Sequence, residues 1–183
     1  RTLADRILLV GCGKERELGD TQYHKIIAKA ATKLNETGSM EGTCYLTELN
    51  VKGRDTHWTV RRAVEITNDA LYQFDHLKSK KDHTRRPLRK LILSVPKRSD
   101  LGTGEQAIRE GLAVSQGMKL AKDLGNMPGN ICTPSYLAKQ ARSHFKPYSN
   151  CKVTILDKMA IEILDMGAFL AVALCRRQEP KLI

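Results

Sequence analysis

The stretch Leu91-Ile92-Leu93-Ser94-Val95-Pro96 is a short apolar run that ends at a proline. Its length, its branched side chains and the proline predict a buried strand. An amphipathic segment follows, in which Thr103 and Gln106 match a capping box and apolar residues recur at helical spacing as far as Leu124. A strand followed by a long helix is typical of an α/β fold.

The same alternation continues toward the amino terminus. Residues 6–13 form an apolar run closed by glycines and predict a buried strand that enters a turn. Residues 43–49 are rich in β-forming side chains and predict another strand. Apolar stripes at helical spacing predict helices over 21–35 and 56–77.

Toward the carboxyl terminus, Thr133 and Pro134 predict the start of a further helix, since threonine caps helices and proline is tolerated at their first position. Residues 152–156 predict a strand, and residues 159–173 a helix that breaks near Gly167. The order of elements therefore predicts an α/β fold in which helices cover a largely parallel sheet.

Composition excludes two classes of protein. The chain has 183 residues, of which 41% are hydrophobic and 28% are charged, so it is not disordered throughout. Its longest apolar run, residues 168–175, is far shorter than the roughly 20 residues of a membrane-spanning helix. The five cysteines form no Cys-x-x-Cys pair, which favours small buried hydrophobic residues in a reducing cytosol.

The positive charge is concentrated in one segment. The chain carries 31 basic and 20 acidic residues, a net charge of +11, and residues 78–98 hold nine of the basic residues but only one acid. Such a segment is either a solvated loop or a contact for the phosphates of a nucleic acid. No aromatic residues are interleaved with these cations, so base stacking is not indicated. The candidate nucleic-acid contacts are Lys78, Lys80, Lys81, Arg85, Arg86, Arg89 and Lys90.

Other local signals for chemistry are weak. Gly11-Cys12-Gly13 ends a predicted strand, where ligands often bind, but it lacks the third glycine of a phosphate-binding turn. An ordinary loop is the alternative, and Cys12 is either a buried thiol or one activated at a helix start. The five histidines are scattered without metal-site spacing, and no Gly-x-Ser-x-Gly elbow is present.

Residues 121–138 contain Asp-Leu-Gly-Asn, Pro-Gly-Asn, Thr-Pro and Leu-Ala in that order. This stretch closely resembles the junction between the two domains of leucine aminopeptidases, also called cytosol aminopeptidases. Residues 6–18 and 36–54 resemble the amino-terminal domain of bacterial aminopeptidase A, and residues 166–173 resemble the family's Met-Gly-x-x-Leu-x-Val stretch. The resemblance spans nearly the whole chain.

The resemblance implies how the chain is organised. Residues 1–101 would form the amino-terminal domain, a macro-domain-like mixed sheet flanked by helices and incomplete at its start. Residues 102–126 would form a long linker helix. Residues 127–183 would be the truncated beginning of the catalytic domain, a helix-strand-helix of a second α/β domain. We therefore expect an internal fragment of a longer enzyme.

The resemblance also implies a function. Family members are cytoplasmic homo-hexamers that release amino-terminal residues, leucine preferred, from peptides. They use two divalent ions, zinc or manganese, bridged by a water that attacks the peptide carbonyl. Some bacterial members also bind DNA. No residue here matches the family's metal ligands, so we expect no catalytic, metal or cofactor-binding residue in this chain and no activity from it alone. Residues 174–177 depart from the family pattern.

Overall fold

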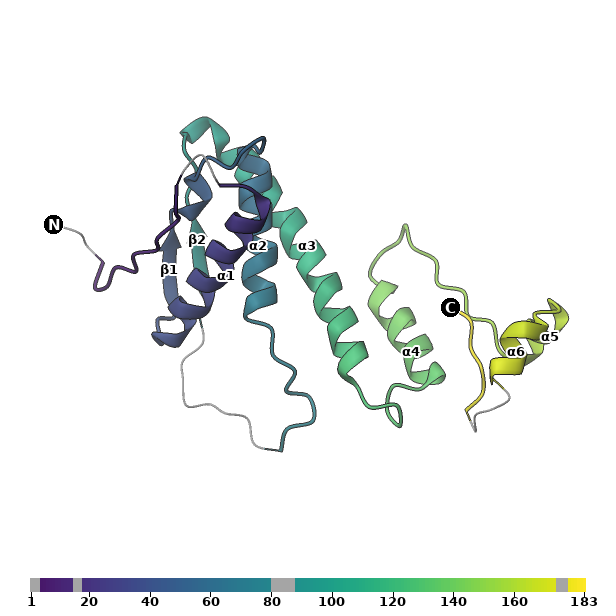
Figure 1. Ribbon diagram of the computed structural model, residues 1–183. Coiled ribbons are helices and arrows are strands. Elements are labelled where there is room, and N and C mark those ends of the chain that lie inside the picture. The colour runs from purple at the N-terminus through teal and green to yellow at the C-terminus, as the bar shows by residue number, and fades with distance from the viewer. Residues whose placement is uncertain (1–3, 15–17, 80–87, 174–177) are drawn as a thin grey trace. The chain divides into compact units, whose positions relative to one another are not determined.

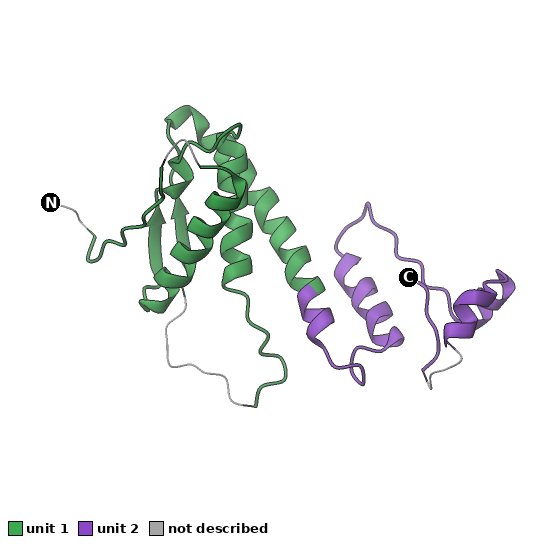
Figure 2. Cartoon of the chain, in the orientation of Figure 1, with its two compact units in different colours: residues 1–121 green, residues 122–183 purple. Residues whose placement is uncertain are grey.

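The computed structural model contains two compact units, residues 1–121 and residues 122–183 (Figure 2). It describes residues 4–14, 18–79, 88–173 and 178–183. Within these ranges the fold is a mixture of helices and strands that is rich in helix and has one small parallel sheet. No helix among them has both the length and the apolar composition that a membrane span requires.

The sheet of the first unit consists of two parallel strands, β1 (Glu41–Cys44) and β2 (Lys90–Leu93). Thr43 lies opposite Ile92 in this register. Parallel strands need a crossover connection, and helix α2 (Thr56–Ala70) lies between them in the sequence and supplies it (Figure 1). The predicted α/β alternation is therefore present in this part of the chain.

The helices of the first unit lie on one face of the sheet. A side chain added at Gly42 of β1 would come within 2.8 Å of Leu34, which belongs to helix α1 (Asp20–Glu36). On the opposite face, Ile92 of β2 keeps 47% of its surface exposed. Parallel sheets are usually covered on both faces, so this sheet is half covered within the described residues.

The core of the first unit forms between α1, α2 and the loop that connects β1 to α2. Its buried members come from α1, α2 and the connecting loops, and they are Leu18, Tyr23, Ile26, Ile27, Val51, Ala63 and Ile66. The Tyr23 ring also lies 5.6 Å, between centroids, from the ring of Trp58. Burial of this apolar surface is the main stabilising contribution to the unit.

Buried hydroxyl groups connect the same elements by hydrogen bonds. The Tyr23 hydroxyl donates to the Thr59 carbonyl of α2 at 2.9 Å. The Thr59 hydroxyl donates to the Thr47 carbonyl at 3.1 Å, and the Thr47 hydroxyl donates to the Ser94 carbonyl at 2.6 Å. Thr47 lies in the 3-10 helix η2 (Leu46–Glu48), and Ser94 directly follows β2. The chain of bonds thus joins both helices to the sheet.

Helix α3 (Leu101–Asn126) follows the 3-10 helix η3 (Arg98–Asp100) and packs against α2 within the first unit. A Cβ added at Gly111 would lie 3.0 Å from both the Arg61 carbonyl oxygen and the Val64 Cβ. Glycine at this position therefore lets the two helices approach closely. Thr103 and Gln106 lie inside α3, because the helix begins earlier than the predicted capping box.

In the second unit, helix α4 (Pro134–Phe145) begins as predicted. The Thr133 hydroxyl oxygen accepts a hydrogen bond from the Tyr136 backbone N–H at 3.3 Å, and Pro134 occupies the first turn. The hydroxyl satisfies one of the backbone donors that every helix leaves unpaired at its start. The sequence predicts this helix start correctly because the cap joins residues that are only three positions apart.

Helices α5 (Lys158–Ile163) and α6 (Gly167–Ala173) are separated by the predicted break. Asp165 adopts φ 53° in the left-handed region. The backbone N–H groups of Met166 and Asp165 bond to the carbonyls of Ile161 and Glu162, which is the pattern of a Schellman helix end. The break therefore centres on Asp165, two residues before the predicted glycine.

Two predicted strands are absent from the described residues. Residues 6–10 form no strand, and Ile7, Leu8 and Leu9 are exposed, although Val10 packs on the core. Residues 152–156 contribute only one antiparallel bridge, between Leu156 and Leu182. Both predictions failed for the same reason, because a strand requires a neighbour to pair with and an apolar run does not specify one.

Several predicted boundaries also differ from the structure. Strand β1 ends at Cys44, and residues 46–48 turn into η2 instead of continuing the strand. Helix α2 is capped by Asp55, whose carboxylate accepts from the Trp58 N–H at 2.8 Å, and it ends at Ala70 instead of residue 77. The start of the helix depends on this cap, because the aspartate carboxylate satisfies a backbone donor that the first turn leaves unpaired.

We predict opposite effects for two glycine substitutions on α3. Gly111→Val should lower the free energy of unfolding by about 1–3 kcal/mol, because the added side chain would overlap α2. Gly117→Ala should raise it by up to about 1 kcal/mol, since nothing lies within 4 Å of the added methyl group and alanine favours a helix. Urea unfolding followed by circular dichroism measures both. Equal stability of the two variants would contradict the packing of α3 on α2.

Candidate functional site

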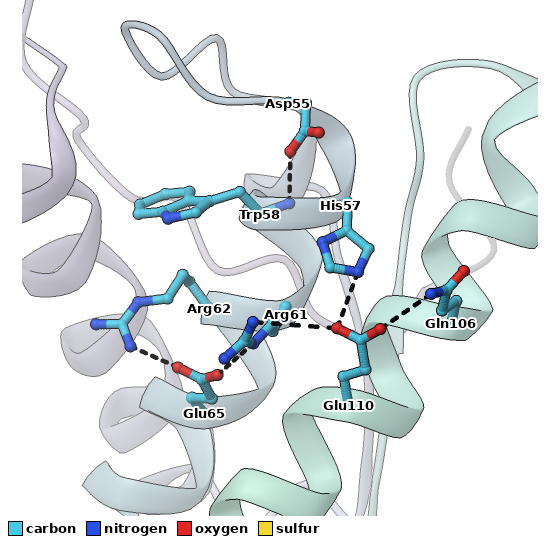
Figure 3. Close-up of polar contacts among 8 residues, drawn as sticks. All are labelled: Asp55, His57, Trp58, Arg61, Arg62, Glu65, Gln106 and Glu110. Atoms are coloured by element: carbon cyan, nitrogen blue, oxygen red, sulfur yellow. Dashed lines mark hydrogen bonds and ion pairs between the residues drawn. The ribbon is translucent and has the colours of Figure 1, made fainter.

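A charged network joins α2 and α3 within the first unit (Figure 3). Glu110 of α3 lies at its centre, with one carboxylate oxygen 3.1 Å from His57 Nε2 and the other accepting from Gln106 Nε2 at 3.0 Å. The hydrogen bond from Gln106 holds the pKa of Glu110 below its usual value, and the nearby His57 and Arg61 side chains act in the same direction. Glu110 is therefore ionised at neutral pH, and it cannot act there as a general acid.

A second carboxylate of the network is buried. The Glu65 side chain is only 5% exposed, and it accepts from Arg61 Nε at 2.8 Å and from Arg62 on its other oxygen (Figure 3). Both arginines belong to α2 and lie one helical turn before Glu65. Because a buried carboxylate is costly unless it is paired, these contacts within α2 compensate the Glu65 charge. Arg61 also connects this pair to α3, since its Nη1 lies 4.0 Å from a Glu110 carboxylate oxygen.

Another ion pair lies at the start of α1. Arg54 Nε donates to an Asp20 carboxylate oxygen at 2.9 Å, and the guanidinium carbon lies 4.9 Å from the centre of the Trp58 ring. The hydrogen bond from Arg54 lowers the pKa of Asp20. An anion bound at this helix end would face the Asp20 carboxylate, so the geometry does not favour a phosphate held between residues 11–13 and α1.

The described cysteines are free thiols. Cys12 is half-buried, and its Sγ lies 3.4 Å from the Val10 carbonyl oxygen. Burial raises the pKa of the Cys44 thiol, which keeps it protonated at neutral pH and makes it a poor nucleophile. Cys175 lies outside the described residues.

No metal centre forms in the part of the chain that the structure describes. Nowhere in these ranges do three or more histidine, cysteine, aspartate or glutamate side chains gather in a way that could hold an ion. Zinc usually takes three or four such ligands from a protein. The described residues therefore do not fit a resident metal ion.

The basic segment is described only in part. Lys80, Lys81, Arg85 and Arg86 lie outside the described residues. Lys78 Nζ forms an ion pair with Asp75 at 2.8 Å, and Lys90 Nζ lies 3.7 Å from a Glu41 carboxylate oxygen. The Arg89 backbone N–H bonds to the Met40 carbonyl at 2.8 Å. Both ion pairs are largely exposed and therefore contribute little, so they do not decide for or against a phosphate-binding surface. The nucleic-acid hypothesis stays a prediction.

Comparison with known families identifies the chain. Residues 1–81 match the N-terminal domain of the cytosol aminopeptidase family, and residues 119–183 match the catalytic domain of the same family. The chain belongs to the cytosol aminopeptidase family. The resemblance that the sequence motifs indicated is thereby confirmed.

Individual members of the cytosol aminopeptidase family agree with this assignment. The chain is 58% identical over 170 residues to a probable cytosol aminopeptidase of Vibrio campbellii, a match that covers 93% of the chain and 34% of that protein. It is 56% identical over 177 residues to the cytosol aminopeptidase of Vibrio cholerae, covering 97% and 35% respectively. The chain thus spans about a third of the length of these relatives.

Solved structures share the fold. The bottromycin maturation enzyme BotP, in a complex with Mn, aligns with a TM-score of 0.78 at 20% identity, over 94% of this chain and 34% of its own. A mutant of tomato leucine aminopeptidase aligns with a TM-score of 0.72 at 23% identity, over 88% and 32%. Because the sequence identity is below 25%, these two comparisons show a similar fold and nothing about function.

Helix α3 lies mainly between the two regions that match the family. The two matched regions leave residues 82–118 between them, and α3 occupies most of the second half of that interval. The network around Glu110 belongs to this helix, and sequence reasoning missed it. Glu110 lies one turn after Gln106, which the sequence shows, but the partner His57 lies 53 positions earlier and no local pattern connects the two.

We predict that Gln106→Ala will raise the pKa of Glu110 toward that of an ordinary glutamate, because the variant removes the hydrogen bond that stabilises the carboxylate. A nuclear magnetic resonance titration of the Glu110 carboxyl carbon measures this pKa. Gln116→Ala, on an exposed position of the same helix, is the control and should leave the value unchanged. An unchanged Glu110 pKa in Gln106→Ala would contradict the network.

The nucleic-acid hypothesis has its own test. If the basic segment binds phosphates, replacing Arg85, Arg86 and Arg89 by glutamate should abolish binding to duplex DNA. The slope of log affinity against log salt concentration should fall by about 0.9 for each phosphate that the arginines neutralise. Fluorescence anisotropy with labelled duplex at several salt concentrations measures both. Binding that the triple variant leaves unchanged would remove the hypothesis.

Proposed function

We propose that this chain forms part of an aminopeptidase that releases amino-terminal residues, leucine preferred, from peptides. The observation that carries the proposal is that one chain matches both the N-terminal and the catalytic domain of the cytosol aminopeptidase family, in that order. Relatives at 56% and 58% identity carry the same name. Hydrolysis of the peptide bond is then the reaction of the whole protein.

Within that enzyme we assign three segments. Residues 1–101 form the amino-terminal domain, which we propose to be macro-domain-like, residues 102–126 form a linker helix, and residues 127–183 begin the catalytic domain. Support comes from α3, a continuous helix of 26 residues that spans the proposed linker. We further propose that the enzyme is cytoplasmic and assembles as a homo-hexamer.

We propose that the reaction depends on two divalent metal ions, manganese or zinc, whose ligands lie outside this chain. One structural neighbour, BotP, forms a complex with Mn. The described residues of this chain offer no cluster that fits an ion, so no step of the reaction is assigned to them. Their contribution is structural, because the core and the networks described above hold α2 and α3 in place.

The isolated chain provides the first test. We predict no hydrolysis of leucyl p-nitroanilide by the purified 183-residue chain with added manganese, since the proposed ligands are absent from it. The cytosol aminopeptidase of Vibrio cholerae, assayed in parallel, is the positive control. Robust turnover by the isolated chain would contradict the proposal that its contribution is structural.

A chimera tests the aminopeptidase assignment itself. In it, the matching segment of the Vibrio cholerae protein is replaced by this chain, which is 56% identical to it over 177 residues. We expect the chimera to hydrolyse the leucyl substrate, whereas the same chimera with Gly111→Val should be less stable and less active because the added side chain disturbs the packing of α3 on α2. A chimera that folds and assembles like its parent but has no activity would argue against the proposal.

A further inference from the structure

A pocket of about 340 Å³ lies within the second unit, and no step of the proposed peptidase reaction is assigned to its lining residues. One wall is a face of α4 that carries Lys139 and Arg142, which are three residues apart and therefore neighbours on the helix surface. The opposite wall comes from the segment before α5 and from Lys181 near the carboxyl end.

The antiparallel bridge between Leu156 and Leu182 positions the second wall. Its two backbone hydrogen bonds measure 2.9 Å and 3.1 Å. Side chains alternate along extended backbone, so the residues flanking a bridged pair point to the face opposite the pair. Ile155, Asp157 and Lys181 flank this bridge, and all three line the pocket.

The charges around the pocket are unbalanced. Lys139, Arg142 and Lys181 supply three positive charges, and Asp157 supplies one negative charge, which leaves a net charge of +2. The Asp157 carboxylate is already engaged, because its Oδ1 accepts from the Ala160 N–H at 3.0 Å and caps α5. One oxygen of this carboxylate is therefore bound to the first turn of α5.

The three cations are poorly neutralised by the protein. Lys181 has a side chain only 19% exposed, and its Nζ lies 3.5 Å from the Glu179 carboxylate, which is 74% exposed. The distance is long for an ion pair and the carboxylate partner is largely in solvent, so the pairing is weak. Among the described residues, no carboxylate lies within ion-pair distance of Lys139 or Arg142. An anion in the pocket would therefore meet cations that the fold leaves available.

We propose that this pocket binds a small organic phosphate. A phosphate monoester carries a charge of about −1.5 to −2 at neutral pH, which matches the net charge of the pocket. The planar guanidinium of Arg142 can donate two parallel hydrogen bonds to phosphate oxygens. Ala138, which is 6% exposed, and Ile155 supply apolar surface for the organic part of the ligand.

The volume supports a ligand of this size. Pockets for small molecules generally measure about 300–1,000 Å³, so a pocket of about 340 Å³ suits a compact ligand. The proposal does not rest on the proposed peptidase reaction, because no metal ligand or peptide contact is assigned to the lining residues.

Isothermal titration calorimetry of the 183-residue chain with glycerol 3-phosphate tests the proposal, and glycerol serves as the uncharged control ligand. We expect saturable binding of one glycerol 3-phosphate per chain and no binding of glycerol. Arg142→Gln and Lys181→Gln should each weaken binding at least about tenfold, since each variant loses one or more charge-assisted hydrogen bonds. Lys146→Gln, which removes a cation at the end of α4 that does not line the pocket, should leave the affinity within about twofold, since it loses no such bond.

Circular dichroism of each variant separates loss of binding from loss of folding, and these exposed or edge positions should leave the spectrum unchanged. Absence of saturable binding to the folded chain would overturn the proposal. So would binding that survives both Arg142→Gln and Lys181→Gln, or binding that Lys146→Gln weakens equally, since either result would mean attraction by general positive charge.

Discussion

The first unit depends on a chain of three hydrogen bonds in which buried hydroxyl groups donate to backbone carbonyls. Tyr23 connects α1 to α2, Thr59 connects α2 to η2, and Thr47 connects η2 to the end of β2. Burial raises the pKa of Tyr23, so the phenol keeps the proton that it donates. An unpaired polar group in this position would carry a desolvation cost, and the bonds therefore fix how the helices lie on the sheet.

Helix α3 packs closely on α2 because the residue at the contact, Gly111, has no side chain. Gly111 brings its backbone against α2, and the carboxylate of Glu110, one position earlier, reaches His57 on α2. Glu65 is paired by two arginines of its own helix, so its buried charge is compensated. Glu110 thus joins α3 to α2, and Glu65 is neutralised within α2, which is why we assign this part of the chain a structural contribution.

The sequence predicts features that depend on neighbouring residues and misses those that depend on distant ones. The start of α4 follows from Thr133 and Pro134, and the apolar stripe of α1 identifies its buried face. The run at residues 6–10 has the composition of a strand, yet its exposed Leu9 finds no strand to pair with in the described residues. The Glu110 network and the proposed phosphate pocket likewise unite residues separated by tens of positions, and no local pattern reveals them.

We propose that this chain of the cytosol aminopeptidase family contributes structure, and that the groups holding the proposed metal ions lie elsewhere. Metal content measures this most directly. The purified chain is equilibrated with manganese and zinc, passed through a desalting column and analysed by mass spectrometry for bound metal. The account predicts far less than one tightly held ion per chain, and two ions retained per chain would contradict it.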